Sequence, residues 1–213
     1  KGDGKNGAGR IVSIVQGTNF KTENYAYDEL GNLATEQKII SYQSTIGTKT
    51  YTSAYTYDSW GRALEMLYPD GEHVVYHYKN TGELNSISSK LANESVYVPL
   101  IKNMEYDGFE NMTLLVYGNN GTTTFSYNSQ TKSLNGLTLD AITSTGATQL
   151  LNKQYTRDAM GRVTTVSNSA MGYTNPNSSV TMGQAYSFTH TYDQFNRLAK
   201  TTGTYETGEG PDS

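Results

Sequence analysis

The chain has 213 residues, a net charge of −4 and 35% hydrophobic residues, with 18 tyrosines against 5 phenylalanines and 1 tryptophan. Its Lys and Arg residues are not clustered, which excludes the electrostatic footprint of a nucleic-acid interface. The absence of cysteine excludes disulfides, zinc–thiolate centres and a cysteine nucleophile.

The chain begins with residues 1–9, a glycine-rich stretch that we expect to be a flexible end. No apolar segment of the kind found in signal peptides follows it. Residues 10–203 predict one repeat-built β-sheet domain, because tyrosine and threonine favour strands while glycine and asparagine favour tight turns. Residues 204–213 predict a flexible tail, and no apolar run approaches the roughly 20 residues of a membrane helix.

One motif recurs along the chain, as YAYDELGNL at 25–33, YTYDSWGRAL at 55–64 and HTYDQFNRL at 190–198. Aligned on the aspartate, the clear copies carry Asp28, Asp58, Asp107, Asp158 and Asp193. Two weaker copies have Lys79 and Asn128 at that position. Recurrence at variable intervals marks a repeat architecture built from supersecondary units.

Two anchor residues precede each turn, spaced by two, so that both lie on one face of a strand. Most of them are aromatic. We therefore expect an aromatic stripe of cross-strand neighbours, mostly buried, that supplies much of the core. The pairs are Tyr25/Tyr27, Tyr55/Tyr57, Tyr76/Tyr78, Met104/Tyr106, Phe125/Tyr127, Tyr155/Arg157 and His190/Tyr192.

The turn follows from its own residues. The aspartate at the first position can accept hydrogen bonds from backbone N–H groups two residues on, as in an Asx turn. The fourth position requires a left-handed backbone, which glycine adopts most readily and asparagine next. That position holds Gly31, Gly61, Gly82, Gly161 and Asn196. Glu110 is the exception, and Asn111 directly after it would allow that turn to shift by one residue.

In each copy an apolar residue follows the turn, such as Leu33 or Val163. A second residue, apolar in most copies, lies three positions further on, as Val166 does after Val163. A spacing of three breaks strand alternation and predicts either a β-bulge or a strand covered on both faces. A helix is disfavoured, because segments such as GRVTTVSNS are rich in β-branched residues. The expected fold class is all-β: repeated antiparallel β-hairpins that form a continuous, curved or spiralling sheet.

The turn carboxylates could be interpreted as acid–base pairs, but their recurrence at the first turn position favours a structural role. Three arginines follow turns and are expected to lie in solvent. They are Arg62, Arg162 and Arg197. No motif of a catalytic, phosphate-binding or metalloenzyme centre occurs, so no catalytic residue, cofactor or metal is predicted.

Three histidines and a tryptophan carry the remaining candidate chemistry. His73 and His77 lie four residues apart, which on a strand is about 13 Å and too far for both to ligate one zinc ion. Trp60 lies at a turn tip, where an exposed ring could stack on a sugar. Packing on the neighbouring turn is the alternative. His190 takes an anchor position and is expected to pack there.

The stretch YPDGEHVVYHYKNTGELNSI at 68–87 joins a Pro-Asp-Gly turn to the repeated motif. It resembles the RHS/YD-repeat family, whose pattern it follows except at Lys79 and Glu83, where the family has Asp and Arg. YTYDSWGRAL, RDAMGRV and TYDQFNRL resemble the family as well. Members include bacterial Rhs polymorphic toxins, the shell of insecticidal toxin complexes, wall-associated proteins and animal teneurins.

The resemblance implies a spiral of hairpins laid edge to edge, which in toxin members forms a hollow shell around a toxic C-terminal domain. It also implies an extracellular or cell-surface location. The implied partner is the rest of the chain's own polypeptide, with glycans as a second class. The expected function is a non-enzymatic scaffold segment of a larger exported or surface bacterial protein. The alternative is a carbohydrate-binding module that uses exposed tyrosines and Trp60.

Overall fold

The computed structural model describes residues 6–17, 21–41, 47–143, 146–174, 181–182 and 184–205. Every regular element in these ranges is a β-strand, and none of the described residues is helical. The predicted all-β class is therefore confirmed. The chain divides into two compact units, residues 1–100 and 101–213. The ends expected to be flexible, residues 1–9 and 204–213, lie mostly outside the described ranges.

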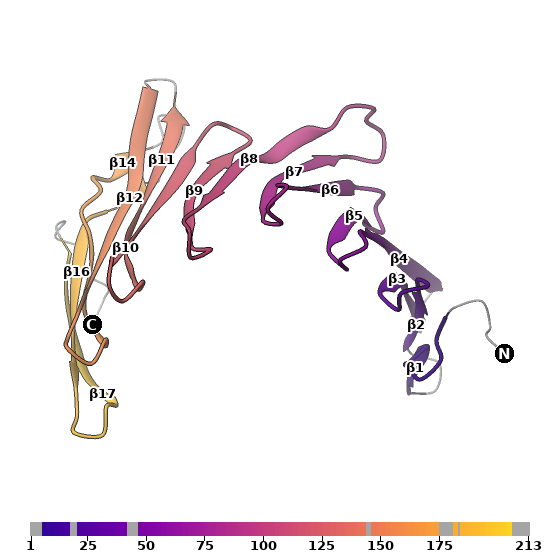
Figure 1. The fold of residues 1–213 in the computed structure, drawn as a ribbon, viewed down its shortest axis with the longest axis horizontal. Coiled ribbons are helices and arrows are strands. Elements are labelled where there is room, and N and C mark those ends of the chain that lie inside the picture. Colours follow the sequence, from indigo (N-terminus) through magenta and orange to yellow (C-terminus); the bar gives the residue numbers. More distant parts are fainter. Residues whose placement is uncertain are drawn as a thin grey trace. The chain divides into compact units, whose positions relative to one another are not determined.

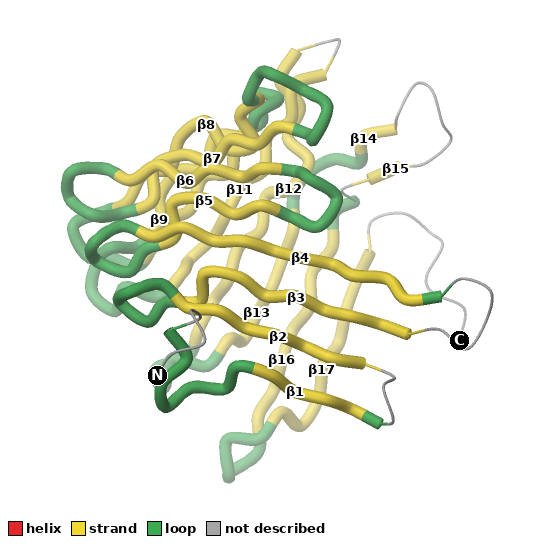
Figure 2. Tube along the Cα trace, turned by 90° about the vertical axis from the view of Figure 1, so that its right-hand side faces the viewer, coloured by secondary structure: helices red, strands yellow, loops and turns green. Residues whose placement is uncertain are grey.

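In the first unit, each strand pairs antiparallel with the next strand along the chain (Figure 1). Figure 2 shows the loops between them, drawn in green, at the ends of the strands. The strands are β1 Ser13–Gln16, β2 Lys21–Tyr27, β3 Leu33–Ser41, β4 Thr48–Tyr57, β5 Ala63–Leu67, β6 His73–Tyr78 and β7 Leu84–Lys90. Hairpin follows hairpin with no crossover, as the repeated strand–turn–strand pattern predicts.

The second unit has the same meander, with one insertion. Its strands are β8 Val98–Tyr106, whose first three residues belong to the first unit, β9 Met112–Tyr117, β10 Thr122–Tyr127, β11 Leu134–Thr143, β12 Gly146–Arg157, β13 Val163–Asn168, β16 Tyr186–Tyr192 and β17 Leu198–Tyr205. Between β13 and β16, which pair directly, the chain makes a two-stranded ribbon of β14 Tyr173–Thr174 and β15 Thr181–Met182. The unusually long interval between the last two copies of the motif reflects this insertion.

We call the seven turns that carry the motif the repeat turns. They begin at Asp28, Asp58, Lys79, Asp107, Asn128, Asp158 and Asp193. A β-bulge follows each of them. After the Asp58 turn, for example, Tyr57 pairs with Ala63 but Thr56 pairs with Glu65, so that Leu64 is the extra residue. Of the two explanations for the spacing of three, the bulge is confirmed.

The expected stripe of neighbouring aromatic rings is wrong in its arrangement. A return strand lies between successive anchor strands, and it places apolar side chains opposite five of the seven first anchors, the exceptions being Tyr25 opposite Glu36 and His190 opposite Thr201. Tyr55 pairs with Met66, Tyr76 with Ile87 and Tyr155 with Val166. Aromatic and aliphatic side chains therefore alternate across the sheet, which is also a favourable cross-strand combination.

The apolar core of the described residues is small. The buried apolar side chains are Val74, Met104 and Ala170, and the buried polar ones are Ser89, Thr123 and Asn168. The anchor tyrosines are half-buried rather than buried, because in each unit the repeat forms one layer of strands. The predicted large tyrosine core is therefore wrong. Polar contacts at the turns must carry a larger share of the stability than in a two-layer domain.

Candidate functional site: the row of repeat turns

The Asp58 turn shows how the repeat closes. The N–H of Asp58 donates to the carbonyl of Arg62 at 3.0 Å, and the N–H of Gly61 donates to the carbonyl of Asp58 at 3.0 Å. Gly61 has a φ of 77°. The backbone is thus a type I turn followed by a left-handed residue, a loop that joins antiparallel strands without splaying them.

The carboxylate of Asp58 is satisfied inside its own turn. Oδ1 accepts hydrogen bonds from the N–H groups of Trp60 at 2.9 Å and Arg62 at 3.0 Å. Oδ2 accepts from Arg62 Nε at 2.7 Å and lies 2.6 Å from Nη2. The Arg62 N–H, and then its guanidinium, lower the pKa of Asp58 below its ordinary value. A carboxylate held ionised by these donors fastens the turn and is a poor proton donor.

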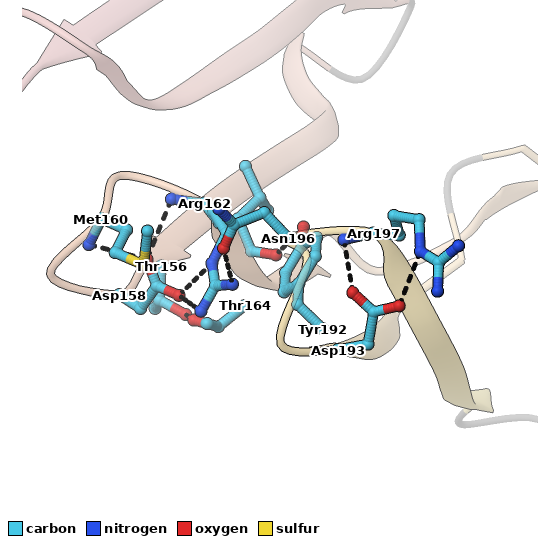
Figure 3. Close-up of polar contacts among 10 residues, drawn as sticks. Thr156, Asp158, Met160, Arg162, Thr164, Tyr192, Asp193, Asn196 and Arg197 are labelled. Atoms are coloured by element: carbon cyan, nitrogen blue, oxygen red, sulfur yellow. Dashed lines mark hydrogen bonds and ion pairs between the residues drawn. The ribbon is translucent and has the colours of Figure 1, made fainter.

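The turns at Asp158 and Asp193 repeat this arrangement with Arg162 and Arg197 (Figure 3). The guanidinium of Arg162 lowers the pKa of Asp158, and the N–H of Arg197 lowers that of Asp193. Three turns thus use the same fork of arginine N–H donors, whose planar geometry suits a carboxylate.

An asparagine takes the place of arginine in the other two aspartate turns. Asn32 Nδ2 donates to Asp28 Oδ2 at 2.9 Å, and Asn111 Nδ2 donates to Asp107 Oδ2 at 3.0 Å. These amides lower the pKa of both aspartates. The fifth turn residue therefore supplies a donor to the first whether it is arginine or asparagine.

The expectation that the three arginines lie in solvent is wrong for two of them. The side chains of Arg62 and Arg162 are 29% and 28% exposed, whereas that of Arg197 is 74% exposed. Arginine usually extends into water when considered alone. The aspartate of the turn does not explain the difference, because Arg197 bonds Asp193 in the same way. Arg62 and Arg162 differ in that they also contact the following turn and its tyrosine, which cover part of each guanidinium group.

Glu110 occupies the left-handed position without shifting its turn. Its φ is 65°, and its N–H donates to the carbonyl of Asp107 at 3.1 Å, just as Gly61 does in its own turn. The predicted shift towards Asn111 is wrong, because Asn111 is needed where it stands to hold Asp107. The other left-handed positions of the repeat turns have φ values of 92° at Gly31, 110° at Gly82, 58° at Lys132, 80° at Gly161 and 63° at Asn196.

Four of the hairpins are tied to the one before them by the second anchor residue. The tyrosine hydroxyl donates to the first carbonyl after the preceding repeat turn: Tyr78 to Ala63 at 2.8 Å, Tyr127 to Met112 at 2.9 Å and Tyr192 to Val163 at 2.8 Å. Arg157 replaces tyrosine in one copy, and its Nη1 makes the same contact with the Leu134 carbonyl at 2.7 Å. Burial raises the pKa of Tyr78 and Tyr127, which keeps the donor protonated.

The arginines form a second tie, from one turn to the next. Arg62 Nη1 donates to the carbonyl of Gly82 at 2.7 Å, and its guanidinium carbon lies 4.2 Å from the ring centroid of Tyr78. Arg162 Nη1 donates to Asn196 Oδ1 at 2.7 Å and lies over Tyr192 at 4.7 Å (Figure 3). Each of these arginines therefore bonds its own aspartate, the following turn and the following tyrosine together.

Trp60 lies at its turn tip with 71% of its surface exposed. The guanidinium carbon of Arg62 lies 4.7 Å from its ring centroid. The ring also approaches the next turn, where a Cβ built on Gly82 would lie 3.7 Å from Trp60 Cζ3. The structure thus places Trp60 against the neighbouring turn, with Arg62 over its ring.

The histidines lie outside this row of turns. His190 Nδ1 is 2.9 Å from Thr201 Oγ1 on the paired strand, so its polar group is satisfied within its hairpin. In the described part of the chain, no three acidic or histidine side chains gather closely enough to hold a metal ion. The same residues include no helix with the length and apolarity to cross a membrane.

Several solved structures contain a region with the same fold as this chain. A chain of the TcdB2–TccC3–Cdc42 complex has a TM-score of 0.70 and 16% identity over 92% of this chain and 12% of that chain. A chain of TcdB2–TccC3 without its hypervariable C-terminal region has a TM-score of 0.70 and 16% identity over 93% of this chain and 12% of that chain. A chain of a Photorhabdus luminescens Tc holotoxin pore has a TM-score of 0.68 and 16% identity over 92% of this chain and 12% of that chain.

No family model and no curated protein matches the sequence. At 16% identity the likeness to the solved structures establishes the fold alone, and the chain spans about an eighth of the length of those chains. The resemblance to toxin-complex shells that the repeated motif predicts is therefore confirmed for the fold.

Acid unfolding is expected to follow the turn aspartates. Each has a folded pKa below its unfolded value of about 3.9, so the unfolded chain binds more protons as the pH falls. Their contribution is complete above about pH 5 and is lost as the pH falls through the folded pKa values. The urea midpoint should change little between pH 7 and 5 and then fall steeply below about pH 4. These residues are Asp28, Asp58, Asp107, Asp158 and Asp193.

A double variant, Asp58→Asn with Asp158→Asn, is the control for acid unfolding. It keeps an acceptor oxygen but lacks the titrating group at two turns. It should be less stable than the parent at pH 7 and lose less of its stability between pH 5 and 3. If the two proteins lose the same amount in that interval, the turn aspartates do not govern the acid response.

Tyr192→Phe tests the tie between hairpins. The variant keeps the ring and removes the hydroxyl that bonds the Val163 carbonyl, so the free energy of unfolding should fall by about 1 kcal/mol. Tyr155→Phe is the matched control, because Tyr155 is a first anchor paired with Val166. Its loss should stay within about 0.5 kcal/mol. Equal losses in urea unfolding would show that the second-anchor hydroxyl has no special role.

Proposed function

We propose that this chain is a wall segment of an RHS/YD-repeat β-shell and acts as a non-enzymatic scaffold. The observation that carries the proposal is the set of repeat turns, which are bonded internally and, from the Asp58 turn to the Lys79 turn and from the Asp158 turn to the Asp193 turn, are bonded to the next by tyrosine and arginine. A sheet of this kind can be extended by adding hairpins, and it does not need a second layer of strands packed against it. Both properties suit the wall of a shell. Its stability is that of a quasi-one-dimensional stack.

The chemistry of the turns supports a structural role over catalysis. All five turn carboxylates accept hydrogen bonds from their own turns, and their pKa values are lowered. General acid catalysis at neutral pH calls for the opposite shift. The repeat turns are therefore suited to holding strands together.

The larger protein is part of the proposal. Solved chains with this fold are about eight times longer, and one of them was solved without a hypervariable C-terminal region. By analogy, we place this segment in a larger exported or surface bacterial protein whose shell encloses or displays another domain. Its partner would then be the remainder of its own polypeptide.

Electron cryomicroscopy of the full-length polypeptide tests this function. We expect a hollow particle in which the hairpins of this chain form part of the wall, with density for another domain enclosed by it or displayed on it. A compact domain without an interior, or repeat hairpins that protrude as an open sheet, would contradict the proposal.

A further inference from the structure

A chain of three polar side chains lies outside the repeat turns, in the first unit. Tyr97 belongs to the connection between β7 and β8 and reaches His73 of β6, with 2.5 Å between its hydroxyl oxygen and Nδ1. On the other side of the ring, His73 Nε2 lies 3.4 Å from Glu65 Oε2 of β5. A phenol, an imidazole and a carboxylate thus lie in series, with a hydrogen bond between the first two and a contact of 3.4 Å between the last two, and a scaffold role does not require them.

The sheet itself sets this geometry. His73 alternates with Val74, which is buried on the face of the anchor tyrosines, so His73 lies on the opposite face. Leu67 pairs with His73, and Glu65 lies two residues along the same face of β5. Two neighbouring strands therefore fix the imidazole and the carboxylate, and Tyr97 comes over them from the connecting loop.

The contact between Tyr97 and His73 suits one tautomer of the imidazole. In the tautomer with the ring hydrogen on Nε2, the Tyr97 hydroxyl donates to Nδ1 of His73 and the ring N–H lies on the side of Glu65. Nucleophile, base and carboxylate stand in the same order as in hydrolase triads, with a phenol in the place of the serine hydroxyl. Lys90 Nζ lies 5.1 Å from the ring centroid of Tyr97, where its charge favours negative charge developing on the phenol oxygen.

Room for a reactant lies beside these groups. A hollow of about 380 Å³ is lined by Glu65, Val75, His77, Ser88 and Tyr97. A second hollow of about 410 Å³ shares Glu65 and adds His73 and Lys90. Both volumes are within the range of about 300–1,000 Å³ of small-molecule sites. Tyr97 is 38% exposed and lines the first hollow, so its side chain borders the space that a ligand would occupy.

We propose that Tyr97 is an activated phenol that accepts an acyl group from small activated esters or thioesters, with His73 as general base and Glu65 as positioning residue. The phenol oxygen attacks the carbonyl carbon while its proton passes to Nδ1 of His73. The tetrahedral intermediate then collapses, the bond to the leaving alcohol or thiol breaks, and the imidazolium returns the proton to that group. Glu65 faces the positive charge that His73 carries in between.

The rate of acetylation by p-nitrophenyl acetate tests this inference in the folded chain. Mass spectrometry of peptides follows each tyrosine over time, and hydroxylamine, which cleaves aryl esters but not amides, separates tyrosine from lysine adducts. Tyr68 and Tyr51 are internal controls, because they are 37% and 42% exposed. Tyr97 should react at least about tenfold faster than either, since general base catalysis contributes roughly 10²–10⁴-fold.

Two variants separate activation from mere contact. His73→Gln should slow Tyr97 at least about tenfold while Tyr68 keeps its rate, which also shows that the fold is intact. Glu65→Gln should lower the limiting rate at Tyr97 several-fold and leave the half-saturating concentration of the ester unchanged. The proposal is overturned if Tyr97 reacts no faster than Tyr68 in the parent chain. It is equally overturned if His73→Gln leaves Tyr97 as fast or faster, because the histidine would then only cover the phenol.

Discussion

Asn168→Ala is expected to lower the free energy of unfolding by roughly 3–5 kcal/mol, because three backbone groups lose their partner at a site where only 3% of the residue is exposed. Oδ1 of Asn168 accepts hydrogen bonds from the N–H of Asn152 at 2.7 Å and of Ala170 at 3.3 Å. Nδ2 donates to the carbonyl of Gln184 at 2.8 Å. The side-chain amide of Asn168 thus joins three segments: strand β12, the segment that leads from β13 to β14, and the segment that leads into β16.

Urea unfolding measures the total loss in Asn168→Ala, and hydrogen exchange locates it. The amides of Asn152 and Ala170 should exchange much faster in the variant, while those of the first unit keep their protection. Asn80→Ala is the control, because Asn80 is exposed in a repeat turn, and it should change stability by no more than about 0.5 kcal/mol. If Asn168→Ala costs as little as the control, the buried amide does not organise the insertion.

Gly61→Val should destabilise the chain by about 1–3 kcal/mol, which for a protein of this size corresponds to roughly 2–4 °C in Tm per kcal/mol. The reason is conformational. Gly61 has a φ of 77°, and a β-branched side chain is strongly disfavoured there. Crowding is not the cause, since a Cβ at this position would meet only Asn32 Oδ1, at an ordinary 3.6 Å.

The sequence provides its own controls for Gly61→Val. Asn196 adopts a φ of 63° at the same turn position, so Gly61→Asn should lower Tm far less than Gly61→Val. In the opposite direction, Glu110 holds a φ of 65°, and Glu110→Gly should raise stability by up to about 1 kcal/mol. Thermal unfolding of the three variants decides the matter, and a Gly61→Val protein as stable as Gly61→Asn would refute the left-handed requirement.

Much of the fold could be predicted because its determinants are local. A left-handed backbone selects glycine or asparagine wherever it occurs, so the turns at Gly61 and Asn196 were recognisable from single positions. The spacing of three after each turn likewise allowed two explanations, and one of them was the bulge now found at Leu64, beside the pair of Tyr57 and Ala63. Such features depend on the conformation of a few consecutive residues and not on what packs against them.

The contacts between hairpins were missed because they depend on how the copies lie in space. The signal for the tyrosine tie was present: the second anchor is always tyrosine or arginine, whereas the first anchor also includes Met104, Phe125 and His190. Asn168 gave no signal, since it is one asparagine among many and its partners at Asn152 and Gln184 lie 16 residues away on either side. Burial alone distinguishes it.

The ties between neighbouring hairpins also bear on how the chain reaches its structure. Tyr78 and Ala63 are 15 residues apart, and even Arg162 and Asn196 are separated by only 34. Contacts of such short sequence separation close small loops, which costs little chain entropy and favours fast formation. Each hairpin can therefore complete its bonds as soon as the following one has emerged from a ribosome or a pore. Folding can advance from the N-terminus at the pace of delivery, and no part of the sheet has to wait for the end of the chain.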